Sequence, residues 1–244
     1  GTLFPYTTLF RSVLLIGLAL IVIAGNSVLA AEPSGANYTE GRDTTAGADD
    51  PEVHNAMAGN VTELTISGYS TTQTWQGYFG NITGVIELGD SDGNILYNWT
   101  QLNPTGEIYA VNESANVEWT NVSCFNTSNN ALTETYERAY NISGIATDGI
   151  NETFNSQGHT AFVTASTSFT SGQCFDVNLY DVNGTGSFEE ILLWDSHSLI
   201  YVGLIETDKT GFLGETADFQ LIVPEDGHEG DVDTTPYYFY IEIE

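Results

Sequence analysis

Short apolar segments separated by turn clusters constrain the fold of this chain more than any other feature. Between residues 71 and 122, runs rich in Tyr, Trp, Ile and Val alternate with groups of Gly, Asp, Asn and Pro. Such runs are typical of half-buried strands, and the Asp92-Gly93 step suits a hairpin turn. We therefore expect an antiparallel sheet of neighbouring strands and no βαβ units.

The pattern continues to residue 244, where an alternating strand places Tyr240 and Glu242 on the face opposite Phe239 and Ile241. So apolar a strand should pair inside a sheet, because an exposed edge would aggregate. One helix is predicted, over residues 131–140. The fold class is all-β: an antiparallel β-sandwich or jelly roll with a flexible N-terminal segment. The predicted strands cover residues 61–67, 72–79, 83–88, 95–99, 107–111, 117–122, 161–169, 174–180, 190–194, 199–205, 219–223 and 235–244.

Composition divides the chain into three parts. Residues 13–24 are almost wholly apolar but shorter than the ~20 residues of a bilayer span, and small residues follow. We predict a secretory signal peptide over residues 1–30, with uncleaved anchoring as the alternative. Residues 1–12 lack a Met and are interpreted as translated sequencing-adapter sequence. The mature chain is expected to carry no membrane span.

After the leader, residues 31–59 are small, polar and acidic, which predicts a flexible stalk because such a segment buries too little apolar surface to offset chain entropy. The alternative is that part of the stalk becomes ordered by pairing with a neighbouring subunit. Residues 60–244 are predicted to form a single β-sandwich domain.

The strongly negative net charge of the chain arises because Lys and Arg are scarce. The chain has 33 Asp and Glu but only 4 Lys and Arg, giving a formal net charge of −29. Such a surface repels nucleic acid, so no nucleic-acid partner is expected. It should attract divalent cations, although acidity that merely keeps the protein soluble is an equally simple reading.

Two features are typical of a secreted chain. Cys124 and Cys174 are the only cysteines, and we predict that they form a disulfide, with a free reactive thiol as the alternative. The predicted mature part also contains ten Asn-x-Ser/Thr sequons, where chance would give about four, so N-glycosylation is expected. The alternative is that richness in Ser, Thr and Asn creates sequons that stay bare. The ten asparagines are Asn37, Asn60, Asn81, Asn98, Asn112, Asn121, Asn126, Asn141, Asn151 and Asn183.

One segment resembles the first nine positions of an EF-hand calcium loop, with a Gly at the sixth. The twelfth position is Leu192 rather than a bidentate Glu, so a plain Asn-Gly turn competes with a calcium site. A second oxygen-rich turn, Asp90 to Asn94, has the same ambiguity. No cofactor is expected, calcium at these turns excepted. The candidate ligands are Asp181, Asn183, Thr185, Ser187 and Glu189.

The sequence contains no catalytic motif, so we do not expect an enzyme. The histidines show no zinc spacing and are expected at the surface. The four tryptophans are candidates for a sugar-stacking platform, against the alternative that they pack in the core. They are Trp75, Trp99, Trp119 and Trp194.

Several segments together resemble secreted proteins of archaeal genomes. They span most of residues 71–244 and read TWQGYFGNITGVIEL, LYNW, GEIYA, VEWTNVSC, DGINETFN, ILLW, DFQLIVPEDGH and TTPYYFYIEIE. This resemblance implies an extracellular or cell-surface β-domain of archaeal type and no particular catalytic residues.

We therefore predict a secreted, N-glycosylated structural protein of the cell envelope: a surface-layer, coat or extracellular filament subunit. Its expected partners are further copies of itself or other envelope glycoproteins, and residues 31–59 or the last strand would complete a neighbour's sheet. The alternatives are a carbohydrate-binding or adhesin module, and a secreted hydrolase with two carboxylates in a cleft.

Overall fold

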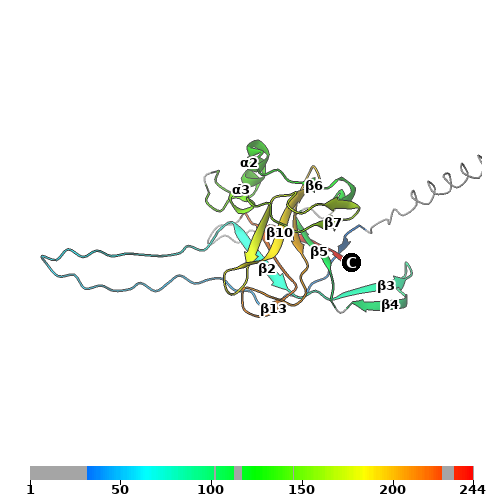
Figure 1. Ribbon diagram of the computed structural model, residues 1–244, viewed down its shortest axis with the longest axis horizontal. Helices are drawn as coiled ribbons and strands as arrows, with labels where there is room; N and C mark the ends of the chain where they lie inside the picture. Colours follow the sequence, from blue (N-terminus) through cyan, green and yellow to red (C-terminus); the bar gives the residue numbers. More distant parts are fainter. Residues whose placement is uncertain (1–31, 102, 113–116, 145, 227–233, 244) are drawn as a thin grey trace, which may run out of the picture. The chain divides into compact units, whose positions relative to one another are not determined.

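A central antiparallel sheet organises the protein. The computed structural model describes residues 32–101, 103–112, 117–144, 146–226 and 234–243, and residues 32–244 group as one compact unit. The sheet has seven strands, with β10 bordered by both β6 and β9 on one side. In sheet order these are β1 (Ser34–Gly35), β15 (Tyr238–Ile243), β5 (Gly106–Val111), β11 (Leu199–Leu204), β10 (Gly186–Trp194), β6 (Ser123–Cys124) and β9 (Asp176–Tyr180). Figure 1 shows β10 and β5 in this sheet.

Four shorter pairs complete the described strands. They are β2 (Trp75–Gly80) with β14 (Phe219–Pro224), β3 (Gly84–Gly89) with β4 (Ile95–Gln101), β7 (Phe162–Thr164) with β8 (Thr167–Phe169), and β12 (Lys209–Thr210) with β13 (Thr216–Ala217). The helical elements are η1 (Trp119–Asn121), α2 (Asn130–Ala139) and α3 (Ile150–Thr153).

Both faces of the central sheet are buried, because successive side chains of its middle strands point to opposite sides. On β11, Ile200 and Val202 pack into one cluster with Trp119 and Phe162, so η1 and the β7–β8 hairpin cover that face. Leu199 and Tyr201 pack into the other. There the β2–β14 pair, α2 and α3 cover the sheet, which makes the fold a β-sandwich with a small helical cap.

The predicted fold class is confirmed, as are most predicted strands and the helix at α2. The predicted strand over residues 61–67 is wrong: Leu64 and Ile66 are exposed and the segment has no strand partner. The strand predicted over residues 117–122 is also wrong, because this segment contains η1 at Trp119–Asn121 and no strand. The single strand predicted over residues 161–169 is a tight hairpin that turns at Ala165, whose φ is 53°.

The N-terminal strand is the main addition to the sequence-based picture. Ser34 and Gly35, within the predicted stalk, pair with Ile241 and Tyr240 of β15. The last strand therefore lies inside the sheet, between β1 and β5, as its apolar character predicts. The predicted leader, residues 1–30, lies outside the described residues.

Candidate functional site

The sequon asparagines lie at the surface. Nine of the ten are exposed, and the tenth, Asn112, is partly exposed just after β5. They occupy loops and turns, with three exceptions: Asn98 lies in β4, Asn121 in η1 and Asn151 in α3. A glycan on each would extend into solvent without displacing the core.

Two neighbouring sequon asparagines, Asn121 and Asn126, differ in whether their Nδ2 atom is hydrogen-bonded. The Nδ2 of Asn121, the atom that a glycan modifies, donates to the Oγ of Ser196 at 3.2 Å and to the carbonyl of Asp195 at 3.5 Å. A glycan there would have to replace one of these bonds. Asn126 instead uses its Oδ1, which accepts the N–H of Ser128 at 3.0 Å. This bond leaves the Nδ2 of Asn126 to the glycan, so Asn126 is the better acceptor by geometry.

The predicted disulfide is confirmed. Cys124 and Cys174 are joined, with their Cα atoms 5.0 Å apart. Cys124 lies in the short edge strand β6, and Cys174 is fully buried just before β9. The bond closes a loop of 50 residues that carries α2, α3 and the β7–β8 hairpin, so it ties the helical cap to the sheet.

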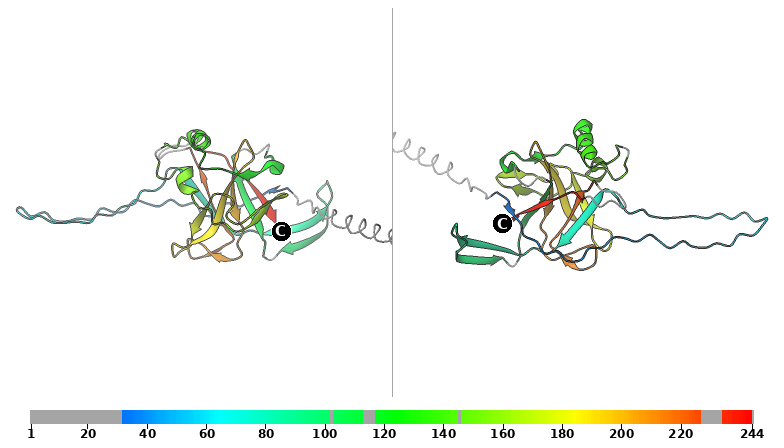
Figure 2. Two further views of the ribbon diagram at one scale, coloured as in Figure 1. Left: turned by 45° about the horizontal axis from the view of Figure 1, so that its top comes forward. Right: turned by 180° about the vertical axis from the view of Figure 1, so that it is seen from behind.

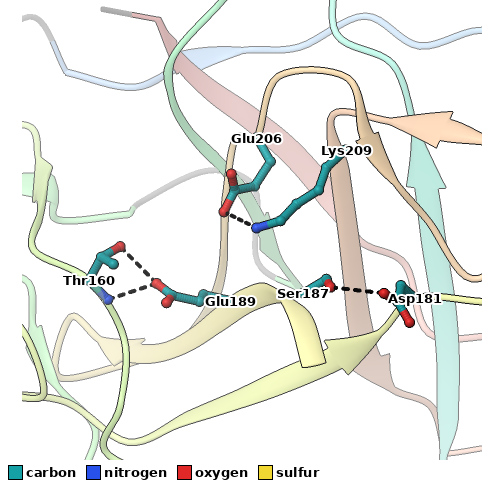
Figure 3. Close-up of polar contacts among 6 residues, drawn as sticks. All are labelled: Thr160, Asp181, Ser187, Glu189, Glu206 and Lys209. Atoms are coloured by element: carbon teal, nitrogen blue, oxygen red, sulfur yellow. Dashed lines mark hydrogen bonds and ion pairs between the residues drawn. The ribbon is translucent and has the colours of Figure 1, made fainter. Parts of the chain in front are cut away.

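The predicted calcium loop is a hairpin turn between β9 and β10. The Oδ1 of Asp181 accepts the N–H of Asn183 at 2.8 Å and of Thr185 at 3.0 Å, and its other oxygen lies 3.4 Å from the hydroxyl of Ser187. The carboxylate of Glu189 points away from this turn and accepts two bonds from Thr160 (Figure 3). The five candidate ligands are therefore not gathered around one point.

The turn at Asp90 repeats this design between β3 and β4. The Oδ1 of Asp90 accepts the N–H of Asp92 and of Asn94, each at 2.9 Å, and Gly93 has a positive φ like Gly184 in the other turn. Hydrogen bonds lower the pKa of both carboxyls. The main donor to Asp90 is the Asn94 side chain, and the main donor to Asp181 is the backbone N–H of Thr185. Each carboxylate thus closes its own turn by accepting hydrogen bonds from the backbone N–H groups of that turn.

Across the described ranges, no three side chains of His, Cys, Asp or Glu lie close enough together to hold a metal ion. His159, expected at the surface, is buried: its Nε2 accepts the N–H of Cys174 at 2.9 Å, and its Nδ1 lies 2.6 Å from the carbonyl of Thr160. This histidine braces the segment that leads to the disulfide.

The tryptophans are divided between the core and one exposed hairpin. Trp119 is buried against Tyr109, while Trp75 and Trp194 are half-buried on the other face of the sheet. Trp99 is 51% exposed on β4. The four rings therefore do not form a common platform, and core packing accounts for three of them.

The β3–β4 hairpin has one apolar face. Its register pairs Ile86 with Trp99 and Leu88 with Tyr97, and these four side chains are each at least half exposed. The opposite face carries Val85, Glu87 and the sequon residue Asn98. The apolar face was missed in the sequence, although the alternation on either side of the Asp90 turn was sufficient to find it.

Two glutamates face each other inside the sandwich. Glu107 on β5 is the register partner of Glu242 on β15, and both are buried. Glu242 accepts bonds from the hydroxyl of Tyr109 and from the N–H of Ala165, each at 2.9 Å. Burial, followed by the charge of Glu107, raises the pKa of the Tyr109 hydroxyl, so it acts as a neutral donor. Nothing in the sequence signalled this pair.

A cavity of about 690 Å³ borders this cluster, between the β7–β8 hairpin and the ends of β5 and β11. Glu107 and Glu206 both line it. Glu206 is engaged by Lys209, whose Nζ lies 2.8 Å from its carboxylate (Figure 3). Only Glu107 thus contributes a buried carboxylate to the described wall of the cavity.

A third buried glutamate braces the two layers of the sandwich. Glu190 on β10 is fully buried, and its Oε2 accepts the N–H of Ile222 on β14 at 2.8 Å. Its other oxygen has no partner within the described protein. Burial raises the pKa of this carboxyl well above its usual value. The hydrogen bond from Ile222 to Glu190 therefore joins the β14 layer to the central sheet, through a carboxyl group whose burial favours the protonated form.

Comparisons with protein-family models, with curated proteins and with solved structures gave no match to this chain. Within the described residues, no helix reaches the length and hydrophobicity that a membrane span requires.

Proposed function

We propose that this protein is a secreted, N-glycosylated structural component of the cell envelope that associates with further copies of itself or with other envelope glycoproteins. One observation carries the proposal: all ten sequon asparagines stand at the surface of a disulfide-bonded β-sandwich. Ten sequons are more than the roughly four that this composition would give by chance, and the structure leaves every one of them accessible to a glycan. The resemblance to secreted archaeal proteins points the same way.

The disulfide supports an extracellular location independently of the sequons. Disulfides persist in oxidising compartments and are rare in the cytosol. The Cys124–Cys174 bond is half-buried at one end and fully buried at the other, so it is part of the packed structure rather than an exposed redox switch.

The test is the mass of the protein isolated from cells that produce it naturally. We expect an intact mass above that of the bare polypeptide, lowered stepwise by Asn→Gln substitutions. Peptides should be generated with chymotrypsin or a Glu-specific protease, because 4 Lys and Arg leave trypsin few sites. Asn126 should be more fully occupied than Asn121, whose Nδ2 is engaged. A bare polypeptide, or a protein confined to the cytoplasm, would refute the proposal.

Carbohydrate binding is a second candidate, favoured by the exposed Tyr97 and Trp99 rings. Their centroids lie 4.9 Å apart but their planes meet at 72°, so they do not form the flat surface on which a sugar ring stacks. The proper comparison is binding of the wild type and of Trp99→Ala to a glycan array. Specific hits that the substitution abolishes would favour this candidate over a purely structural role.

A further inference from the structure

The edge of the central sheet is closed by a short, peripheral contact. Ser34 and Gly35 of β1 pair with two of the six residues of β15, and the N–H of Ala36 donates to the carbonyl of Phe239 at 2.9 Å. Figure 2 shows the two strands side by side. We call residues 33–42 the arm.

Beyond the ladder, the arm is held by two weak contacts. Tyr38 meets Phe239 edge-on with ring centroids 6.1 Å apart, although Tyr38 itself is 78% exposed. Arg42 lies 3.2 Å from Glu215 in an exposed ion pair, a class of contact worth ~0–1 kcal/mol. Within the arm only Pro33 is buried and only Ala36 is partly buried, so detaching the arm exposes little apolar surface.

The connection that follows leaves the arm free to reach elsewhere. Every residue from 43 to 73 is exposed, and none belongs to a helix or strand. Figures 1 and 2 show this segment running out from the sheets and back. Fully extended, it would span roughly 100 Å at ~3.3 Å per residue. Structureless connections of this length are uncommon within a compact domain.

Glycans would not obstruct the acceptor strand. No asparagine occurs after Asn183, so β15 itself carries no sequon, and neither do the central strands β10 and β11. Asn37 follows β1 by two residues and is exposed, so it lies outside the two-residue ladder. The edge of β15 would therefore stay open to another strand even if every sequon carried a glycan.

We propose that the arm is exchanged between copies of this chain, the arm of one molecule pairing with β15 of another. The exchanged contacts are the same as those of the closed monomer, so the equilibrium depends on concentration alone. A flexible tether holds its end at an effective concentration on the order of 1 mM. Closed monomers therefore dominate in dilute solution, and exchange dominates where subunits are crowded. This inference rests on the proposed function, because an envelope layer supplies that crowding.

Cysteine pairing across the ladder tests the exchange. Ser34 and Ile241 are register partners, Ser34 is exposed, and Ile241 belongs to neither core cluster, so single Ser34→Cys and Ile241→Cys variants should fold. The double variant should form an intrachain disulfide in dilute solution, which verifies the register. Mixing the two single variants at about 1 mM and then oxidising them should give a heterodimer in which the two introduced thiols are joined. At 10 μM its yield should fall roughly 100-fold, in proportion to concentration.

The matched control replaces Ser34→Cys by Ser67→Cys, in the exposed connection. We expect at least tenfold less heterodimer from this control at 1 mM. If the two yields are equal at every concentration, or if the double variant forms no intrachain bond, arm exchange is refuted. A glycosylated surface protein that fails this test would leave the proposed function standing, whereas a bare cytoplasmic protein would remove that function whatever the arm does.

Discussion

Replacing one of the two facing glutamates by glutamine should make the protein more stable at neutral pH. Glu107 and Glu242 are directly opposed on β5 and β15, where Cβ atoms lie ~4.5–5.5 Å apart. Two full charges ~5 Å apart at an effective permittivity of ~20 repel each other by about 3 kcal/mol. Glu107→Gln removes this repulsion, keeps an oxygen to accept the N–H of Val163, and adds an N–H that can donate to Glu242.

The measurement is urea unfolding of the wild type and of Glu107→Gln, followed by tryptophan fluorescence. At pH 8 we expect a higher midpoint and a free energy of unfolding raised by up to ~3 kcal/mol.

Glu189 provides the matched control. It also lies on a central strand and accepts two bonds from Thr160, but its register partner on β9 is Asn178 rather than an acid. Glu189→Gln should therefore leave stability unchanged or lower it. A Glu107→Gln variant that is no more stable than wild type at pH 8 would refute the reasoning, since it would mean that the pair carries no net repulsion in the folded protein.

Four further outcomes follow from the structure. Because burial raises the folded-state pKa of Glu190 while the unfolded chain titrates near ~4.3, stability should fall as pH rises above ~4. Glu190→Gln, which keeps an acceptor for the Ile222 N–H, should flatten this slope in urea titrations from pH 4 to 8. Replacing both Cys124 and Cys174 by Ser opens a 50-residue loop and should cost about 4 kcal/mol in the same assay. Ser196→Gly should raise the thermal midpoint by an amount equivalent to less than ~1 kcal/mol, because it relieves the φ of 84° in the β10–β11 turn but removes the hydroxyl that accepts a bond from Asn121. Raising NaCl from about 0.05 to about 1 M should also raise the midpoint, since screening weakens repulsion within a chain of net charge −29.

Structural features that depend on residues close together in the chain could be predicted from the sequence. The turn at Asp90 and the strands on either side of it were predicted from an Asp-Gly step flanked by alternating apolar residues. The disulfide followed from a single pair of cysteines in a chain with a leader-like segment. Residues 61–67 show the limit of this approach: an alternating pattern specifies a strand only if a partner strand is available, and the described part of the chain offers none here.

Features that join distant parts of the chain could not be found in this way. The strand β1 has two residues, too few for any periodicity, and its partner lies at the opposite end of the chain. Glu242 was placed by alternation on the face with Tyr240, which is correct, but its burial depends on Tyr109 and Ala165 covering it. Cross-strand registry between residues 107 and 242 is a tertiary property, and neither glutamate is unusual in its own segment.

The asparagines, and with them the candidate glycosylation sites, are unevenly distributed over the fold. Eighteen asparagines occur between residues 31 and 183, and none occurs in residues 184–244, which include β10, β11, β14 and β15. Low strand propensity accounts for their absence from the strands but not from the connecting loops. Those loops contain Asp208 and Asp226, at positions where Asn would serve as well in a turn, whereas Asp195 needs both of its oxygens to accept backbone N–H groups. A glycan on any of the central strands would obstruct their packing, whereas an aspartate would not. The absence of sequons from this segment is what the proposed glycosylation requires, since a glycan on the central strands would have no room in the packed sheet.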